Sequence, residues 1–83
     1  MTISVTVLYF AQAREESGTT EERFSMPADS SVGALVDRAV ERHPALRRMK
    51  RTIQVALNEE LARGDESLRE GDVIALIPPV AGG

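Results

Sequence analysis

The sequence has no cysteine, no tryptophan and one histidine among its 83 residues, and its other aromatic residues are one tyrosine and two phenylalanines. The lack of cysteine excludes disulfides, thiolate nucleophiles and cysteine-ligated zinc. A single histidine excludes a histidine-rich metal site made by this chain alone. No apolar run approaches the roughly 20 residues that a membrane span needs, and the N-terminus lacks a secretory signal. We therefore expect a cytoplasmic protein with no metal and no membrane contact.

The length and charge of the chain narrow the function classes further. Eighty-three residues form one small domain, which leaves little volume for a catalytic pocket of about 300–1,000 Å³. The composition is 42% hydrophobic and 28% charged, an ordinary globular balance. The formal net charge of −3 argues against a nucleic-acid binder, which usually has a basic excess. These features favour a binding or carrier protein over an autonomous enzyme.

Hydrophobic patterning predicts an α+β domain with one main helix. An i, i+3, i+4 apolar stripe begins at Val32, after possible N-caps at 29–31, and Pro44 ends it. Alternating or fully apolar runs predict strands over 3–10, 21–26, 52–57 and 73–77, with a brief pairing at Leu61 and a short helix over 11–16. One helix covering one face of a mixed sheet, with the first and last strands adjacent in its centre, is the β-grasp, ubiquitin-like order. We expect this domain over 1–79 and a flexible tail over 80–83.

Strand parity predicts an apolar patch on the outer face of the sheet. Alternate residues of the first strand, from Ile3 to Tyr9, face the core, so Leu8 and Phe10 face outward. In the last strand Ile74 and Leu76 face the core, which places Ile77 on the same outer face as Phe10. A small domain would use such a patch to dock.

The most informative segment is the end of the sequence, Pro78-Pro79-Val80-Ala81-Gly82-Gly83. It can be interpreted as a frayed terminus or as the working part of the protein. Two prolines stiffen the exit from the last strand, and two glycines without Cβ atoms can thread a narrow slot. The second interpretation makes the α-carboxylate of Gly83 the active group of a carrier. Transfer to AMP would activate it, and a sulfur donor could then convert it to a thiocarboxylate.

Three stretches, 7–15, 56–61 and 68–83, resemble the small, sulfur-carrier subunits of molybdopterin synthase within the ubiquitin-like MoaD/ThiS family. The last stretch is the most specific, because related thiamine-pathway carriers usually lack its Pro-Pro-Val segment. The resemblance implies that an E1-like adenylating enzyme uses ATP to activate Gly83 and that a persulfide protein supplies sulfur. It implies that Val80, Ala81 and Gly82 insert with Gly83 into a large synthase subunit, which supplies the catalytic residues in a heterotetramer. The carrier itself binds no cofactor.

The same resemblance implies which residues meet the large subunit. Phe10, Leu61 and Ile77 match apolar interface positions, although the family more often has an aromatic residue where Ile77 stands. Arg14 matches a basic position, and Pro78 and Pro79 belong to the same interface.

Other charged groups have simpler expected roles. Arg47, Arg48, Lys50 and Arg51 are expected to form a solvated helix-exit face, with contact to an acidic partner or RNA as the alternative. The adjacent glutamate pairs 15–16, 21–22 and 59–60 have the chemistry of metal ligands or acid–base pairs. Neighbours on a strand point to opposite faces, so we expect no site from any one pair, with contacts to basic patches on partners as the alternative. His43 is expected to stabilise a helix dipole rather than to act in catalysis. Carriage of sulfur for thiazole or for a tRNA base, protein modification, and a plain ubiquitin-like interaction role remain open.

Overall fold

The computed structural model describes residues 1–79, and every structural statement below concerns those residues. The elements follow one another as β1 (Thr2–Tyr9), α1 (Ala11–Ser17), β2 (Glu21–Pro27), α2 (Val32–Arg42), the 3₁₀ helix η1 (Pro44–Met49), β3 (Gln54–Leu57), β4 (Glu60–Leu61) and β5 (Val73–Ile77). None of the helices in this part of the chain has the length and apolar character that crossing a membrane requires.

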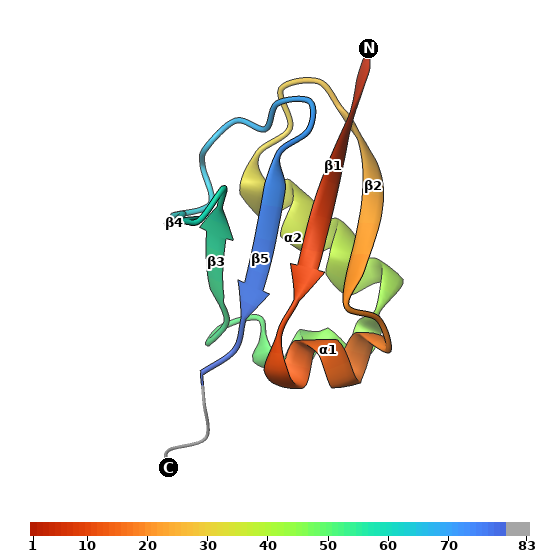
Figure 1. Ribbon diagram of the computed structural model, residues 1–83, viewed down its shortest axis with the longest axis vertical. Coiled ribbons are helices and arrows are strands. Elements are labelled where there is room, and N and C mark those ends of the chain that lie inside the picture. The colour runs from red at the N-terminus through yellow and green to blue at the C-terminus, as the bar shows by residue number, and fades with distance from the viewer. Residues whose placement is uncertain (80–83) are drawn as a thin grey trace.

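The strands form one mixed sheet in the order β2-β1-β5-β3-β4. The first and last strands, β1 and β5, run parallel in its centre, and β2 and β3 flank them antiparallel (Figure 1). The helix α2 crosses one face of the sheet, and α1 lies at the end where β1 and β5 finish (Figure 1). This arrangement confirms the predicted β-grasp fold, including the central placement of the two strands from opposite ends of the sequence.

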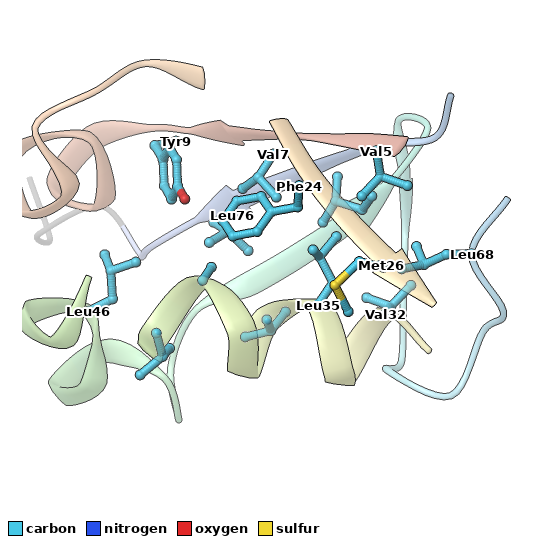
Figure 2. Close-up of a cluster of buried hydrophobic side chains, with 14 of the residues drawn as sticks. Val5, Val7, Tyr9, Phe24, Met26, Val32, Leu35, Leu46, Leu68 and Leu76 are labelled. Carbon is cyan, nitrogen blue, oxygen red and sulfur yellow. The ribbon is translucent and has the colours of Figure 1, made fainter. Parts of the chain in front are cut away.

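The core lies between the sheet and α2. The inward side chains of the central strands, Val5, Val7, Ile74 and Leu76, are each at most 1% exposed. The apolar stripe predicted for α2 is also buried in full, and its members are Val32, Leu35, Val36, Ala39 and Val40. Figure 2 shows these two sets of side chains meeting in one cluster. Each Å² of apolar surface removed from water stabilises the fold by about 25 cal/mol, so this cluster is the main source of stability.

Capping and turn residues set the helix boundaries. The Ser31 hydroxyl accepts a hydrogen bond from the Ala34 amide at 3.1 Å, which confirms the predicted N-cap of α2. Gly18 ends α1 with a φ of 76°, a left-handed conformation that glycine adopts without steric cost. The helix α2 ends at Arg42 because Pro44 follows two residues later. The buried side chain of Leu46 then packs η1 against the core.

Several strand boundaries differ from the prediction by one or two residues, and two of these differences have a clear cause. β1 ends at Tyr9 rather than Phe10, because Phe10 is the N-cap residue of α1. Its amide still donates to the Leu76 carbonyl at 3.2 Å, so Phe10 stays beside β5. β3 begins at Gln54 rather than Thr52, because the amides of Thr52 and Ile53 both donate to the Met49 carbonyl and continue the η1 turn.

Candidate functional site: the outer sheet face and the end of β5

A hollow of about 520 Å³ lies on the outer face of the sheet, opposite α2. Its floor follows from the strand register, in which Ala75 of β5 pairs with Leu8 of β1 on one side and with Ala56 of β3 on the other. Small alanine side chains at two of these positions leave the hollow between larger neighbours. Those neighbours include Phe10, Val73 and Ile77.

Phe10 is the most prominent aromatic group of this face. Its side chain is 44% exposed, whereas Tyr9 and Phe24 are each 2% exposed and belong to the core. The structure therefore brings Phe10 and Ile77 into one hollow, as strand parity predicted. Exposed apolar surface that lines a concavity is typical of a docking site for another protein.

Leu61 is exposed too, at the edge of the same face. It occupies the two-residue edge strand β4 and is 71% exposed. The register pairs it with Ala56, which lies on the floor of the hollow, so Leu61 is on the outer face of the sheet as well. Leu61 also borders a second groove of about 750 Å³ at the β3–β4 edge. The structure therefore places Leu61 at the sheet edge, beside the hollow that Phe10 and Ile77 line.

The two prolines after β5 differ in their surroundings. Pro78 is buried against the fold, whereas Pro79 is exposed. Pro78 thus fixes the chain at the end of the sheet and has little surface left to offer a partner. Val80, Ala81, Gly82 and Gly83, on which the expected chemistry falls, lie outside the described residues.

Arg14 lies near the same end of the sheet. Its amide donates to the Phe10 carbonyl at 3.3 Å, so it sits one helical turn beyond Phe10 in α1. The residue is exposed, and within residues 1–79 its guanidinium makes no ion pair. Arg14 can therefore face a partner that covers Phe10.

Two of the stretches that carry the family resemblance are joined by hydrogen bonds. The Asn58 side chain donates to the Asp72 carboxylate at 3.0 Å and accepts from the Val73 amide at 2.9 Å. Asn58 and Glu59 have φ values of 50° and 74°, so the turn between β3 and β4 is tight. These bonds hold that turn on the start of β5, at the far end of the hollow from Phe10.

A polar cluster that the sequence analysis missed joins β1, β2 and the end of α2. The Tyr9 hydroxyl donates to Glu22 Oε1 at 2.8 Å, and His43 Nε2 lies 2.8 Å from the same oxygen. Arg42 Nη1 donates to Glu22 Oε2 at 3.3 Å, and the Arg42 guanidinium stacks 4.5 Å from the centre of the Phe24 ring. The predictions from sequence assign no structural role to Glu22 and do not include the contact between His43 and this carboxylate.

Strand parity could have revealed the role of Glu22. Glu22 alternates with Phe24 and Met26, which are both buried, so the side chain of Glu22 lies on the core-facing side of β2. Tyr9 is also on the core side, and a buried tyrosine hydroxyl usually needs a hydrogen-bond partner.

Burial and mutual contacts shift the pKa values of Tyr9 and Glu22. Burial raises the pKa of Tyr9, and the hydrogen bond to Glu22 and its negative charge raise it further. Partial burial raises the pKa of Glu22, but hydrogen bonds from His43, Tyr9 and Arg42 outweigh this and leave it below its ordinary value. Glu22 is therefore ionised and acts as the acceptor that holds three other side chains.

We expect Glu22→Gln to destabilise the fold by about 1–2 kcal/mol at neutral pH, because charged hydrogen bonds are lost at a partly exposed site. A carboxyl whose pKa is lowered by folding stabilises the protein above its unfolded pKa, and this contribution is lost as the pH falls through the folded value. The difference in unfolding free energy between the wild type and Glu22→Gln should therefore be largest above the ordinary glutamate pKa of 4.5. It should disappear in stronger acid. Urea unfolding across the pH range measures it.

Glu41→Gln is the matched control for this experiment. Glu41 is 74% exposed and lies 3.8 Å from Arg38 on the surface of α2. Its replacement should change the unfolding free energy by less than about 0.5 kcal/mol. Equal losses in the two variants would contradict the role assigned to Glu22.

The other ion pairs of residues 1–79 are isolated contacts at the surface. Lys50 lies 2.6 Å from Asp37, and Arg48 lies 3.6 Å from Glu16. Within residues 1–79, no three histidine or acidic side chains are grouped so that they could hold a metal ion.

Comparison with known proteins places these features in context. The ThiS family model matches residues 7–83 of the chain. The chain is 37% identical over 83 residues to the molybdopterin synthase sulfur carrier subunit of Chlamydomonas reinhardtii, with 98% of this chain and 100% of the relative covered. Several solved structures are also similar. Small archaeal modifier protein 1 of H. volcanii has 32% identity and a TM-score of 0.86, covering 94% of this chain and 99% of that one. A chain in the complex of subunits 1 and 2 of molybdopterin-converting factor from Helicobacter pylori has 28% identity and a TM-score of 0.66, covering 98% and 100%.

Proposed function

Because the chain belongs to the ThiS family, we propose that it is the sulfur carrier subunit of a molybdopterin synthase and serves molybdenum cofactor biosynthesis. The observation that carries this function is the similarity to named sulfur carrier subunits over nearly the whole chain, 37% over 83 residues. The family match also extends through Gly82 and Gly83.

Gly83 is the residue that carries sulfur. Its α-carboxylate attacks the α-phosphate of ATP in an activating enzyme, which releases pyrophosphate and leaves an acyl-adenylate. The outer sulfur of a donor persulfide then attacks the acyl carbon, AMP leaves, and an acyl disulfide joins the carrier to the donor. A second thiol attacks the donor's sulfur, forms a disulfide with it and releases the thiocarboxylate of the carrier. The thiocarboxylate is the group that gives sulfur to the dithiolene of molybdopterin. ATP is thus a substrate of the partner, and the carrier needs no cofactor of its own.

The carrier brings this group to catalytic residues on another protein. In residues 1–79 the groups with shifted pKa values include Tyr9 and Glu22, which hold each other on the core side of the sheet. They face away from the hollow that contains Phe10, so they do not meet a tail leaving β5. The large synthase subunit supplies the catalytic residues, and Val80, Ala81 and Gly82 thread its cleft.

The outer sheet face docks on that large subunit. Phe10 is the anchor because it is aromatic, exposed and placed beside the end of β5. Ile77 extends the same apolar surface, and Arg14 and Pro79 border it. Pro78 supports the surface from within the fold. Leu61 contacts the partner only where the interface reaches the β3–β4 edge.

Intact mass of the protein purified from its native host tests the function. We expect a fraction of the molecules to carry the mass increase of one oxygen replaced by sulfur, located at Gly83 by fragmentation. The same chain made in a host without the activating enzyme is the control and should carry only the carboxylate. A native-host sample with no thiocarboxylate, from cells with active molybdopterin synthase, would contradict the proposal.

Protein modification is a second candidate, favoured by the 32% identity to a small archaeal modifier protein. In that role Gly83 would form an isopeptide with a lysine of a target. Lys50 is the only lysine in the chain, which offers one site for chain building. The same mass experiment separates the roles, because a modifier gives larger conjugates joined through Gly83.

A further inference from the structure

A group of arginines lies where the chain leaves the sheet. Arg47 and Arg48 belong to η1, and Arg51 follows in the turn before β3; we call these three the η1 basic patch. Gln54 at the start of β3 pairs antiparallel with Ile77 at the end of β5. The residues just before Gln54 therefore lie at the end of the sheet where β5 finishes. Figure 1 shows the green segment before β3 at the same end of the sheet as the end of β5.

The fold leaves these arginines available. All three residues are exposed. Within residues 1–79, the ion pairs of the fold include neither Arg47 nor Arg51. The Arg48 side chain is 78% exposed, and its 3.6 Å contact with Glu16 is a surface pair of small energy. Lys50 differs, because Asp37 holds it at 2.6 Å, and it is left out of the patch.

The patch stands out against the charge of the whole chain. The formal net charge is −3, so the surface outside the patch is more acidic than this total. An uneven distribution of this kind orients a protein during diffusional encounter. The patch therefore favours approach of the exit end toward an acidic surface.

The short reach of the tail determines what faces the patch. Four residues follow Pro79, and a fully extended chain of that length spans at most about 13–14 Å. A protein that encloses Gly83 in a cleft must therefore bring its surface within that distance of the exit. Arg48 and Arg51 lie at the exit, so they meet the surface that borders the mouth of the cleft.

We propose that the η1 basic patch docks on an acidic surface of the large synthase subunit, beside the mouth of the cleft that receives the tail. This inference rests on the proposed function and adds an electrostatic contact to the apolar one at Phe10. The two contacts have different physical effects. The patch accelerates association and is screened by salt, whereas the apolar anchor slows dissociation at any ionic strength. A nucleic-acid partner is disfavoured, because the formal net charge is −3 and Phe10 is the one tyrosine or phenylalanine of residues 1–79 that is exposed for a base to stack on.

The test measures association and dissociation rates with the purified large subunit at low salt and near 1 M salt, where the screening length is about 3 Å. The variant Arg48→Glu plus Arg51→Glu should lower the association rate at low salt by about tenfold or more, with little change at high salt. Arg38→Glu plus Arg69→Glu is the matched control, because it makes the same change in net charge on α2 and before β5. We expect it to change the association rate less than about threefold. Phe10→Ala should instead raise the dissociation rate at both salt concentrations.

Two results would overturn the inference while leaving the function intact. One is an equal slowing by the patch variant and the control, which would make net charge the cause. The other is association of the patch variant at the wild-type rate. Failure of the wild-type chain to bind the large subunit at all would overturn the proposed function as well. Tighter binding of the wild-type chain to a single-stranded RNA oligonucleotide than to the large subunit would replace the protein partner by a nucleic acid.

Discussion

Deletion of Gly83 is expected to abolish sulfur transfer while leaving the fold and partner binding nearly unchanged. The deletion still ends in a glycine carboxylate, so the chemical group is preserved and only its reach is lost. One residue of extended chain is about 3.3–3.6 Å, and a misplacement of about 1 Å at a reacting centre can cost about 100-fold in rate. We therefore expect conversion of the pterin precursor to fall by more than about 100-fold.

Single-turnover conversion with the large subunit measures this loss, and calorimetry measures binding. Gly83→Ala is the companion variant, because it keeps the reach and adds one Cβ atom at the reacting residue. A smaller loss for Gly83→Ala than for the deletion identifies reach as the dominant requirement. Wild-type conversion by the deletion variant would show that Gly83 is not the residue that carries sulfur.

Unchanged binding in the deletion variant follows from the placement of the proposed docking surface. Phe10 directly follows β1 and Ile77 ends β5, so the packing of the sheet holds both. The Phe10 amide donates to the Leu76 carbonyl, which ties Phe10 to β5, the last strand of the fold. Under the proposed function, docking and delivery of sulfur are therefore separate properties of the chain, and the position of β5 couples them.

Much of this fold could be predicted because the apolar periods are unambiguous. Val73–Ile77 is apolar throughout, a pattern that is typical of a central strand with another strand on each side. The α2 stripe has a clear helical period, a serine N-cap and a proline stop. Boundaries were less predictable, because hydrogen bonds decide them. The Thr52 amide could have extended the β3 ladder, but it donates to the Met49 carbonyl and so continues the η1 turn.

The candidate site was predicted in part for a related reason. Parity within a strand correctly brought Phe10 and Ile77 to one face. Leu61 lies on the same face but at its edge, because β4 is a two-residue edge strand paired with β3. Pro78 directly follows β5 and is buried. These features depend on how elements pack, which the pattern within a single element does not determine.

Glu22 illustrates a failure of another kind. A charged residue in a short strand is ordinarily assigned to solvent, yet the alternation with Phe24 and Met26 was visible in the sequence. The acceptor role of Glu22 depends on Arg42 and His43, which lie 20 and 21 residues further along the chain. Only the packing of α2 across the sheet brings these groups together.

Ile74→Ala is expected to destabilise the protein by about 2–5 kcal/mol, the usual cost of truncating a fully buried isoleucine. Ile74 is 0% exposed and pairs with Val7 on one side and Leu57 on the other, so the lost side chain leaves a cavity at the centre of the sheet. A chain of this size has a total stability of about 4–12 kcal/mol. The variant should therefore unfold at a much lower urea concentration, with an unchanged slope if unfolding stays two-state.

Val73→Ala is the matched control, since Val73 is the preceding residue of the same strand and is 36% exposed on the opposite face. Its truncation should cost less than about 1 kcal/mol, because its side chain keeps contact with water in the folded state. The contrast separates burial from strand propensity, which both substitutions change alike. In the Ile74→Ala variant, sulfur transfer should fall in proportion to the unfolded fraction, because β5 sets both the docking face and the point from which the tail departs. A variant that stays folded but loses transfer would instead place Ile74 in the delivery step, contrary to the purely structural role assigned by its burial.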